Sequence, residues 1–109
     1  MQRIKTNEDW GKILKQSKEQ PILLLKFSMT CISSISALKE FKALNTDLPK
    51  YLVIVQLERD VSNFIENDLG VKHESPQFLI LLNEKGIWQA THYKIKRTLL
   101  TEAIHTYVK

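Results

Sequence analysis

Nearly continuous apolar runs alternate along the chain with segments whose apolar residues recur every three or four positions. The runs at 22–27, 51–57 and 77–82 predict strands, because such runs are typical of strands buried on both faces. Asn83 to Gly86 predicts a glycine-containing hairpin loop, followed by a last strand from Ile87 to about Tyr93. A short first strand near Ile4 completes the predicted set.

The helical spacing predicts four helices between and after these strands. Thr6, with Asp9 three residues later, is typical of a helix N-cap. Asp60 and Thr98 are predicted to cap the third and the last helix, and Gly70 to end the third. The predicted apolar faces consist of Trp10, Ile13 and Leu14; of Ser34, Ala37, Leu38, Phe41 and Leu44; of Val61, Phe64, Ile65 and Leu69; and of Leu100, Ala103, Ile104 and Tyr107.

The predicted order of elements is β-α-β-α-β-α-β-β-α. Alternation of strands and helices favours parallel pairing through right-handed crossovers, whereas the last two strands are expected to pair as an antiparallel hairpin. The fold class is therefore α/β, a three-layer sandwich around a mixed central sheet. With 109 residues and no linker or repeat, we expect a single domain over 1–109.

Composition narrows the possible functions. The net charge is +4, and its densest cluster, at 94–97, has only Tyr93 as an aromatic neighbour, so we predict a solvated surface and no nucleic-acid partner. The single cysteine excludes an internal disulfide. The three histidines and this cysteine lack the spacing of metal ligands, so no metal and no bound cofactor is expected.

The chain shows no signal for export or for a membrane. Met1–Lys5 has no apolar stretch typical of a signal peptide. The longest apolar run, Phe78–Leu82, is much shorter than the roughly 20 residues that span a bilayer. We therefore expect no membrane partner and a cytoplasmic protein, where a single thiol stays reduced.

Cys31 is the candidate for chemistry, because it follows a buried strand and opens the second helix. Unpaired N–H groups and the positive end of the helix dipole favour a thiolate there, and cysteines so placed have lowered pKa values. Taken alone, however, a cysteine at this position is also compatible with an inert core residue.

A second segment, His73-Glu74-Ser75-Pro76-Gln77, enters the strand at 77–82. Pro76 either marks the start of the strand in an ordinary trans bond or forms a cis bond in a tight turn. In the cis form, the backbone of Ser75 would face the start of the second helix and could pair with an extended peptide.

Together, Thr30-Cys31-Ile32-Ser33-Ser34 and the His-Glu-Ser-Pro-Gln segment resemble the monothiol bacilliredoxin-type family of the thioredoxin-like superfamily, which is associated with bacillithiol. The resemblance covers essentially the whole chain. The family's usual run after the cysteine is Pro-Ile-Ser, whereas this chain has Ile-Ser-Ser. The Cys-x-x-Ser spacing is kept.

The resemblance implies a thioredoxin-like fold and roles for five residues. Cys31 would be the catalytic nucleophile, with Thr30, Ser34, Ser75 and Pro76 at the substrate. Pro76 would be the cis-proline and Ser75 the backbone partner of the substrate. Ser34 stands where dithiol thioredoxins carry a resolving cysteine, and its hydroxyl can hydrogen-bond the thiolate.

The implied function is that of a monothiol thiol-disulfide oxidoreductase. Cys31 would take bacillithiol, or a similar low-molecular-weight thiol, from mixed disulfides on S-thiolated client proteins. Bacillithiol is thus the expected co-substrate. The alternative is a non-catalytic thioredoxin-fold interaction module in which Cys31 is a redox-sensing thiol. Iron–sulfur carriage is not expected, because the Cys-Gly-Phe-Ser pattern of monothiol glutaredoxins is absent.

Overall fold

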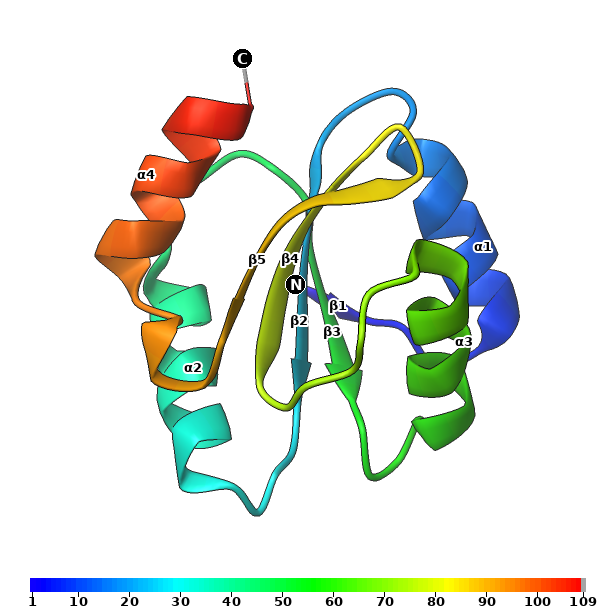
Figure 1. The fold of residues 1–109 in the computed structure, drawn as a ribbon, viewed down its shortest axis with the longest axis horizontal. Helices are drawn as coiled ribbons and strands as arrows, with labels where there is room; N and C mark the ends of the chain where they lie inside the picture. The colour runs from blue at the N-terminus through cyan, green and yellow to red at the C-terminus, as the bar shows by residue number, and fades with distance from the viewer. Residues whose placement is uncertain (109) are drawn as a thin grey trace.

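The computed structural model describes residues 1–108, so the predicted domain boundary at residue 109 lies outside the described residues. Five strands form one sheet in the order β1-β3-β2-β4-β5 (Figure 1). The strands are β1 (Gln2–Arg3), β2 (Ile22–Phe27), β3 (Lys50–Ile54), β4 (Gln77–Leu82) and β5 (Lys85–Thr91). The helices are α1 (Asn7–Gln16), α2 (Ile32–Ala43), α3 (Arg59–Leu69) and α4 (Arg97–Tyr107), with a 3-10 turn, η1, at His92–Lys94.

The predicted mixed sheet is confirmed, with one difference in strand direction. β2 lies at the centre, parallel to β3 and antiparallel to β4, so that Leu25 is opposite Leu52 on one side and Phe78 on the other. β4 and β5 pair antiparallel, as expected for a hairpin. The difference is that the helical connection through α3 leads to an antiparallel strand, whereas alternation alone favoured a parallel one.

The helices cover the sheet in pairs. α2 and α4 lie on one side of the sheet, and α1 and α3 lie on the other (Figure 1). Because side chains alternate along a strand, Leu25 enters the core beneath α2 and α4, here called the α2/α4 face, and Leu24 enters the core beneath α1 and α3, the α1/α3 face. Each face therefore has its own hydrophobic cluster, and β2 contributes to both.

Two of the four predicted helix signals are confirmed, and two are wrong. The Thr6 hydroxyl accepts a hydrogen bond from the Asp9 N–H at 3.0 Å, and Gly70 ends α3 with a left-handed φ of 64°. Asp60 is not the N-cap of α3. The cap residue is Glu58, whose carboxylate accepts from the backbone N–H of Ile54 at 2.8 Å and so fixes the start of the helix.

The predicted cap at Thr98 is also wrong, because the cap residue of α4 is Lys96 and the helix begins two residues earlier than a Thr98 cap implies. Its first residue, Arg97, donates its backbone N–H to Glu40 of α2 at 2.8 Å. A carboxylate from a distant helix thus satisfies an N–H group that sequence reasoning assigned to a local cap.

The boundaries of two strands, β3 and β5, differ from the prediction. β3 ends at Ile54, because 55–57 form a turn in which the Leu57 N–H bonds to the carbonyl of Ile54 at 3.0 Å. In the β4–β5 hairpin the left-handed residues are Asn83 and Glu84, and Gly86 already lies in β5. Two consecutive residues with positive φ match the twist of a two-residue hairpin, so β5 begins and ends earlier than predicted.

Candidate functional site

Cys31 lies between the end of β2 and the start of α2. It is the N-cap residue of α2, with extended backbone angles of φ −98° and ψ 129°, and its free thiol is partly exposed. This is the predicted position. The N–H groups of the first helical turn therefore lie next to the sulfur.

The thiol is held by groups that stabilise its charged form. Its Sγ atom lies 3.0 Å from the hydroxyl of Ser33. Hydrogen bonding from the Ser33 side chain, followed by the backbone N–H of Ser34, lowers the pKa of Cys31, while slight desolvation acts in the opposite direction. The site therefore favours a thiolate, the form in which cysteine is a nucleophile.

The hydroxyl that contacts the Cys31 sulfur belongs to Ser33, and not to Ser34 as expected. Sequence reasoning assigned the hydroxyl contact with the thiolate to Ser34. The Ser34 side chain is fully buried, and its hydroxyl accepts from the backbone N–H of Ser28 at 3.0 Å, which ties the loop after β2 to α2. Ser34 lowers the pKa of Cys31 chiefly through its backbone, and its hydroxyl has the smallest effect.

Gln56 is a site residue that sequence reasoning missed. Its side chain accepts from the backbone N–H of Met29 at 2.8 Å and donates to the hydroxyl of Thr30 at 3.0 Å. The turn after β3 thereby fixes the two residues before Cys31. The available signal was a polar residue directly after a buried strand, at the edge where the parallel strands β2 and β3 both end.

The segment before β4 reaches the same edge of the sheet. The Ser75–Pro76 peptide bond is cis, one of the two alternatives left open by the residues and the one implied by the resemblance. The carbonyl of Pro76 accepts from the N–H of His92 at 3.1 Å. Because β4 runs antiparallel to β2, its start lies beside the end of β2, at the lower edge of the sheet in Figure 1.

His73 faces α3. Its backbone N–H donates to the carboxylate of Glu66 at 2.6 Å, and its Nδ1 lies 3.4 Å from the hydroxyl of Ser62. Burial, followed by the nearby charge of Lys26, lowers the pKa of His73. His73 is not among the groups that shift the pKa of Cys31.

Leu25, six residues before the cysteine, is fully buried on the α2/α4 face. The core beneath the nucleophile has an apolar side chain in that position.

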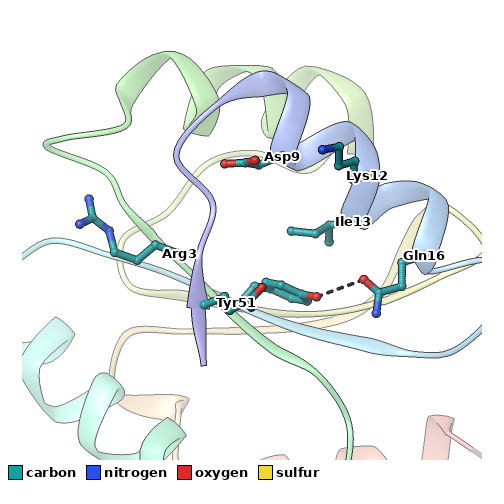
Figure 2. A pocket seen from close by; sticks show the side chains of 7 residues that line it. Arg3, Asp9, Lys12, Ile13, Gln16 and Tyr51 are labelled. Carbon is teal, nitrogen blue, oxygen red and sulfur yellow. Dashed lines mark hydrogen bonds between the residues drawn. The ribbon is translucent and has the colours of Figure 1, made fainter.

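A separate hollow of about 210 Å³, whose lining includes neither Cys31 nor its neighbours, lies between α1 and the strands β1 and β3 (Figure 2). Figure 2 shows Tyr51 at its base, with the phenol donating to Gln16 at 3.0 Å. The charged side chains of Arg3, Asp9 and Lys12 surround it, and Cys31 is not among the residues that line it. Within residues 1–108, no three His, Cys, Asp or Glu residues are arranged to hold a metal ion.

Comparison with known proteins gives the family. The model of the family described as monothiol bacilliredoxin BrxC matches residues 2–100. The chain belongs to the monothiol bacilliredoxin family. This bacilliredoxin is similar to a solved structure described as a putative oxidoreductase with a thioredoxin fold, with 31% identity and a TM-score of 0.84 over 93% of this chain and 90% of that one.

More distant relatives confirm the fold of this bacilliredoxin. Thioredoxin from Fasciola hepatica has 17% identity and a TM-score of 0.79, over 98% of this chain and 99% of that one. A reduced thioredoxin pre-protein from Schistosoma mansoni has 16% identity and a TM-score of 0.79, over 98% and 97%. The fold is thioredoxin-like, as predicted. The family, together with the putative oxidoreductase of 31% identity, identifies this bacilliredoxin as a thiol-disulfide oxidoreductase. Among the described residues, no helix has the length and apolar character needed to cross a membrane.

Proposed function

We propose that this bacilliredoxin removes bacillithiol, or a similar low-molecular-weight thiol, from mixed disulfides on S-thiolated client proteins. One observation carries the proposal: the chain's single cysteine caps α2 with its pKa lowered by Ser33 and Ser34. A thiolate without a second thiol in the chain performs exchange and cannot complete a dithiol cycle. We expect the reaction to take place in the cytoplasm.

The transfer step follows from thiol–disulfide exchange. The Cys31 thiolate attacks the low-molecular-weight sulfur of the mixed disulfide, a new S–S bond forms between them, and the client leaves as a thiolate that takes a proton from solvent. A free low-molecular-weight thiol or a separate reductase then attacks the adduct and restores Cys31. No bound cofactor takes part in these steps.

The same edge of the sheet offers groups for holding the substrate. We propose that Ser75 pairs with the client through its backbone, that Pro76 packs beside the reacting sulfurs and that Thr30 contacts the substrate. Ser34, which the resemblance placed at the substrate, is fully buried and serves the site through its backbone N–H at the Cys31 sulfur. Two features support this assignment: Thr30 is exposed directly before the nucleophile, and the segment before β4 shares its edge with the end of β2.

Intact-mass spectrometry of a bacillithiolated client with equimolar protein tests the proposal. The expected result is that the client loses the mass of bacillithiol while the wild-type protein gains it, and that Cys31→Ala leaves the client unchanged. Release of the client without an adduct on Cys31, or equal release by Cys31→Ala, would overturn the proposal. Slow adduct formation that a second thiol does not reverse would identify the redox-sensing alternative.

A further inference from the structure

Lys26 is fully buried, although it lies in a strand of apolar residues five positions before the nucleophile. Its side chain lies on the α1/α3 face, since it alternates with Leu25 and is paired across the sheet with Gln77. Its Nζ atom donates one long hydrogen bond, 3.4 Å, to the carbonyl of Ser62 in α3. The proposed transfer reaction does not use this amine.

The surroundings of Lys26 connect it with the segment that enters β4. Ser62, which accepts from the amine, places its own hydroxyl 3.4 Å from His73, and Glu66 one turn later accepts the backbone N–H of His73. The Glu66 carboxylate also interacts electrostatically with Lys26. These four residues, here called the Lys26 cluster, join β2, α3 and the segment before β4.

The amine has an energetic cost for the fold. Burial lowers the pKa of Lys26 to about 8, with the charge of Glu66 acting in the opposite direction. A buried charge with few hydrogen bonds is often less favourable than an apolar side chain of the same size. Through Ser62, the amine is connected to His73, which lies two residues before the proposed substrate contact at Ser75.

We propose that Lys26 is a positioning residue for thiol transfer: its buried ammonium, acting through Ser62 and Glu66, holds the segment His73–Pro76 where the client backbone pairs with it. The inference rests on the proposed function. Cys31 is held separately, by the first turn of α2, and Gln56 holds the two residues before it, so Lys26 affects the reaction with a client and not the thiol itself.

The ammonium form does the positioning, because the neutral amine has no charge with which to attract Glu66. The charged or titratable groups that face the cluster are Glu66 and Arg59 from α3, and His73 and Glu74 from the segment before β4. The partners of Lys26 in β3 and β4, Val53 and Gln77, carry no charge. His73, with its lowered pKa, is neutral above pH 7, so Lys26 is the group of the cluster that loses its charge at mildly alkaline pH.

The test compares two rates on the same protein. Alkylation of Cys31 by iodoacetamide needs only the thiolate, whereas transfer from a bacillithiolated peptide needs the segment as well. The ratio of the transfer rate to the alkylation rate removes the titration of Cys31. Lys26→Met and Glu66→Gln are compared with the wild type, and Lys85→Met, exposed at the opposite end of the sheet, is the matched control.

We expect Lys26→Met to lower the ratio by about tenfold at pH 7, the effect of losing a charge-assisted contact, with alkylation unchanged. Glu66→Gln lowers it in the same direction, and Lys85→Met leaves it as in the wild type. The wild-type ratio falls as pH rises from 7 through 9, and the Lys26→Met ratio stays flat.

The inference is overturned if the Lys26→Met ratio equals that of the wild type, or if the wild-type ratio does not fall with pH. The wild-type pH profile requires no variant, so a Lys26→Met protein that fails to fold does not remove the test. A wild type that is alkylated normally but transfers no bacillithiol overturns the proposed function itself. Normal transfer with an unchanged ratio in Lys26→Met overturns only the role of Lys26.

Discussion

The two faces of the sheet differ most at two neighbouring residues of β2. On the α2/α4 face, below the helix that carries the nucleophile, Leu25 packs in an apolar cluster. On the α1/α3 face, Lys26, Glu58, Ser62 and Gln77 are all buried. Among the described residues, the buried charged side chains, Lys26 and Glu58, thus belong to the side away from the nucleophile's helix, whereas the buried polar residues of α2 itself, Ser33 and Ser34, are uncharged. The Cys31 thiolate is stabilised by the local hydrogen bonds of Ser33 and Ser34, without a buried charge beneath it.

The comparison separates two tasks within one small fold. The N-terminal end of α2 favours the thiolate form of Cys31. The α1/α3 face supports the segment His73–Pro76, which we propose pairs with the client. Substitutions on one face should therefore change thiol ionisation, and substitutions on the other should change client transfer.

Replacing the nucleophile has the largest expected effect. Cys31→Ser should reduce transfer from a bacillithiolated client to the rate measured without protein, because a hydroxyl is not ionised at neutral pH. The circular dichroism spectrum should remain that of the wild type, since the side chain is partly exposed and small. Residual transfer well above that background would show that another group performs the reaction.

A charge placed on the apolar face should destabilise the protein strongly. Leu25→Asp buries an uncompensated carboxylate, so its free energy of unfolding at pH 7 should fall by about 3–5 kcal/mol. Urea titrations should show a smaller loss at pH 4, where the raised pKa of this buried acid leaves it protonated. Leu25→Asn controls for polarity without charge. A Leu25→Asp protein as stable as the wild type would show that the α2/α4 face accepts a buried charge as readily as the α1/α3 face does.

The opposite change on the other face should stabilise the protein. Lys26→Met should raise the free energy of unfolding at pH 7 by about 1–4 kcal/mol, because it removes a buried ammonium. The pKa of Lys26 is lowered from 10.5 to about 8 in the fold, so between these values the unfolded chain binds more protons and wild-type stability rises with pH. The advantage of Lys26→Met is therefore full below pH 8 and shrinks above it. Urea unfolding at pH 7 and pH 9.5 measures the gain in stability and its decrease with pH. A Lys26→Met protein less stable than the wild type at pH 7 would contradict the conclusion that the buried ammonium destabilises the fold.

Ser33→Ala tests the hydrogen bond to the sulfur. Without the hydroxyl, the pKa of Cys31 should rise, and alkylation at neutral pH should slow by about fivefold, as expected for one hydrogen bond of about 1 kcal/mol. Ser36→Ala, on the same helix, is the matched control. Equal alkylation rates for the two variants would mean that backbone N–H groups alone, and not the Ser33 hydroxyl, lower the pKa of Cys31.

Gln56→Ala should have the smallest effect. It removes two exposed hydrogen bonds that position Met29 and Thr30, so client transfer should slow by about twofold. Gln20→Ala, exposed in the loop before β2, is the control. A loss much larger than that of Ser33→Ala would mean that the loop before Cys31, and not the helix end, governs the site.

The sequence predicts what depends on local pattern. The bounds of β2 and β4 follow from continuous apolar runs, and Thr6 and Gly70 act through neighbours in the chain. The start of α4 at Arg97 depends instead on Glu40, a contact between residues 57 positions apart. No local pattern contains such a partner.

The site shows the same division. Cys31 at a helix start and the cis bond before β4 were within reach of sequence reasoning. Gln56 acts across two strands, and the choice between the hydroxyls of Ser33 and Ser34 depends on which way each side chain points from α2. The burial of Lys26 could not be predicted from the sequence, because lysine side chains are ordinarily in contact with water even when their neighbours in the strand are apolar.

The pKa of Cys31 tests the central claim most directly. It is measured from the pH dependence of iodoacetamide alkylation, with a peptide of residues 29–35 as the unstructured reference, in which the ordinary value of about 8.5 applies. The account predicts a lower pKa in the folded protein than in the peptide, because Ser33 and Ser34 stabilise the thiolate. Equal values, or a higher value in the protein, would contradict it.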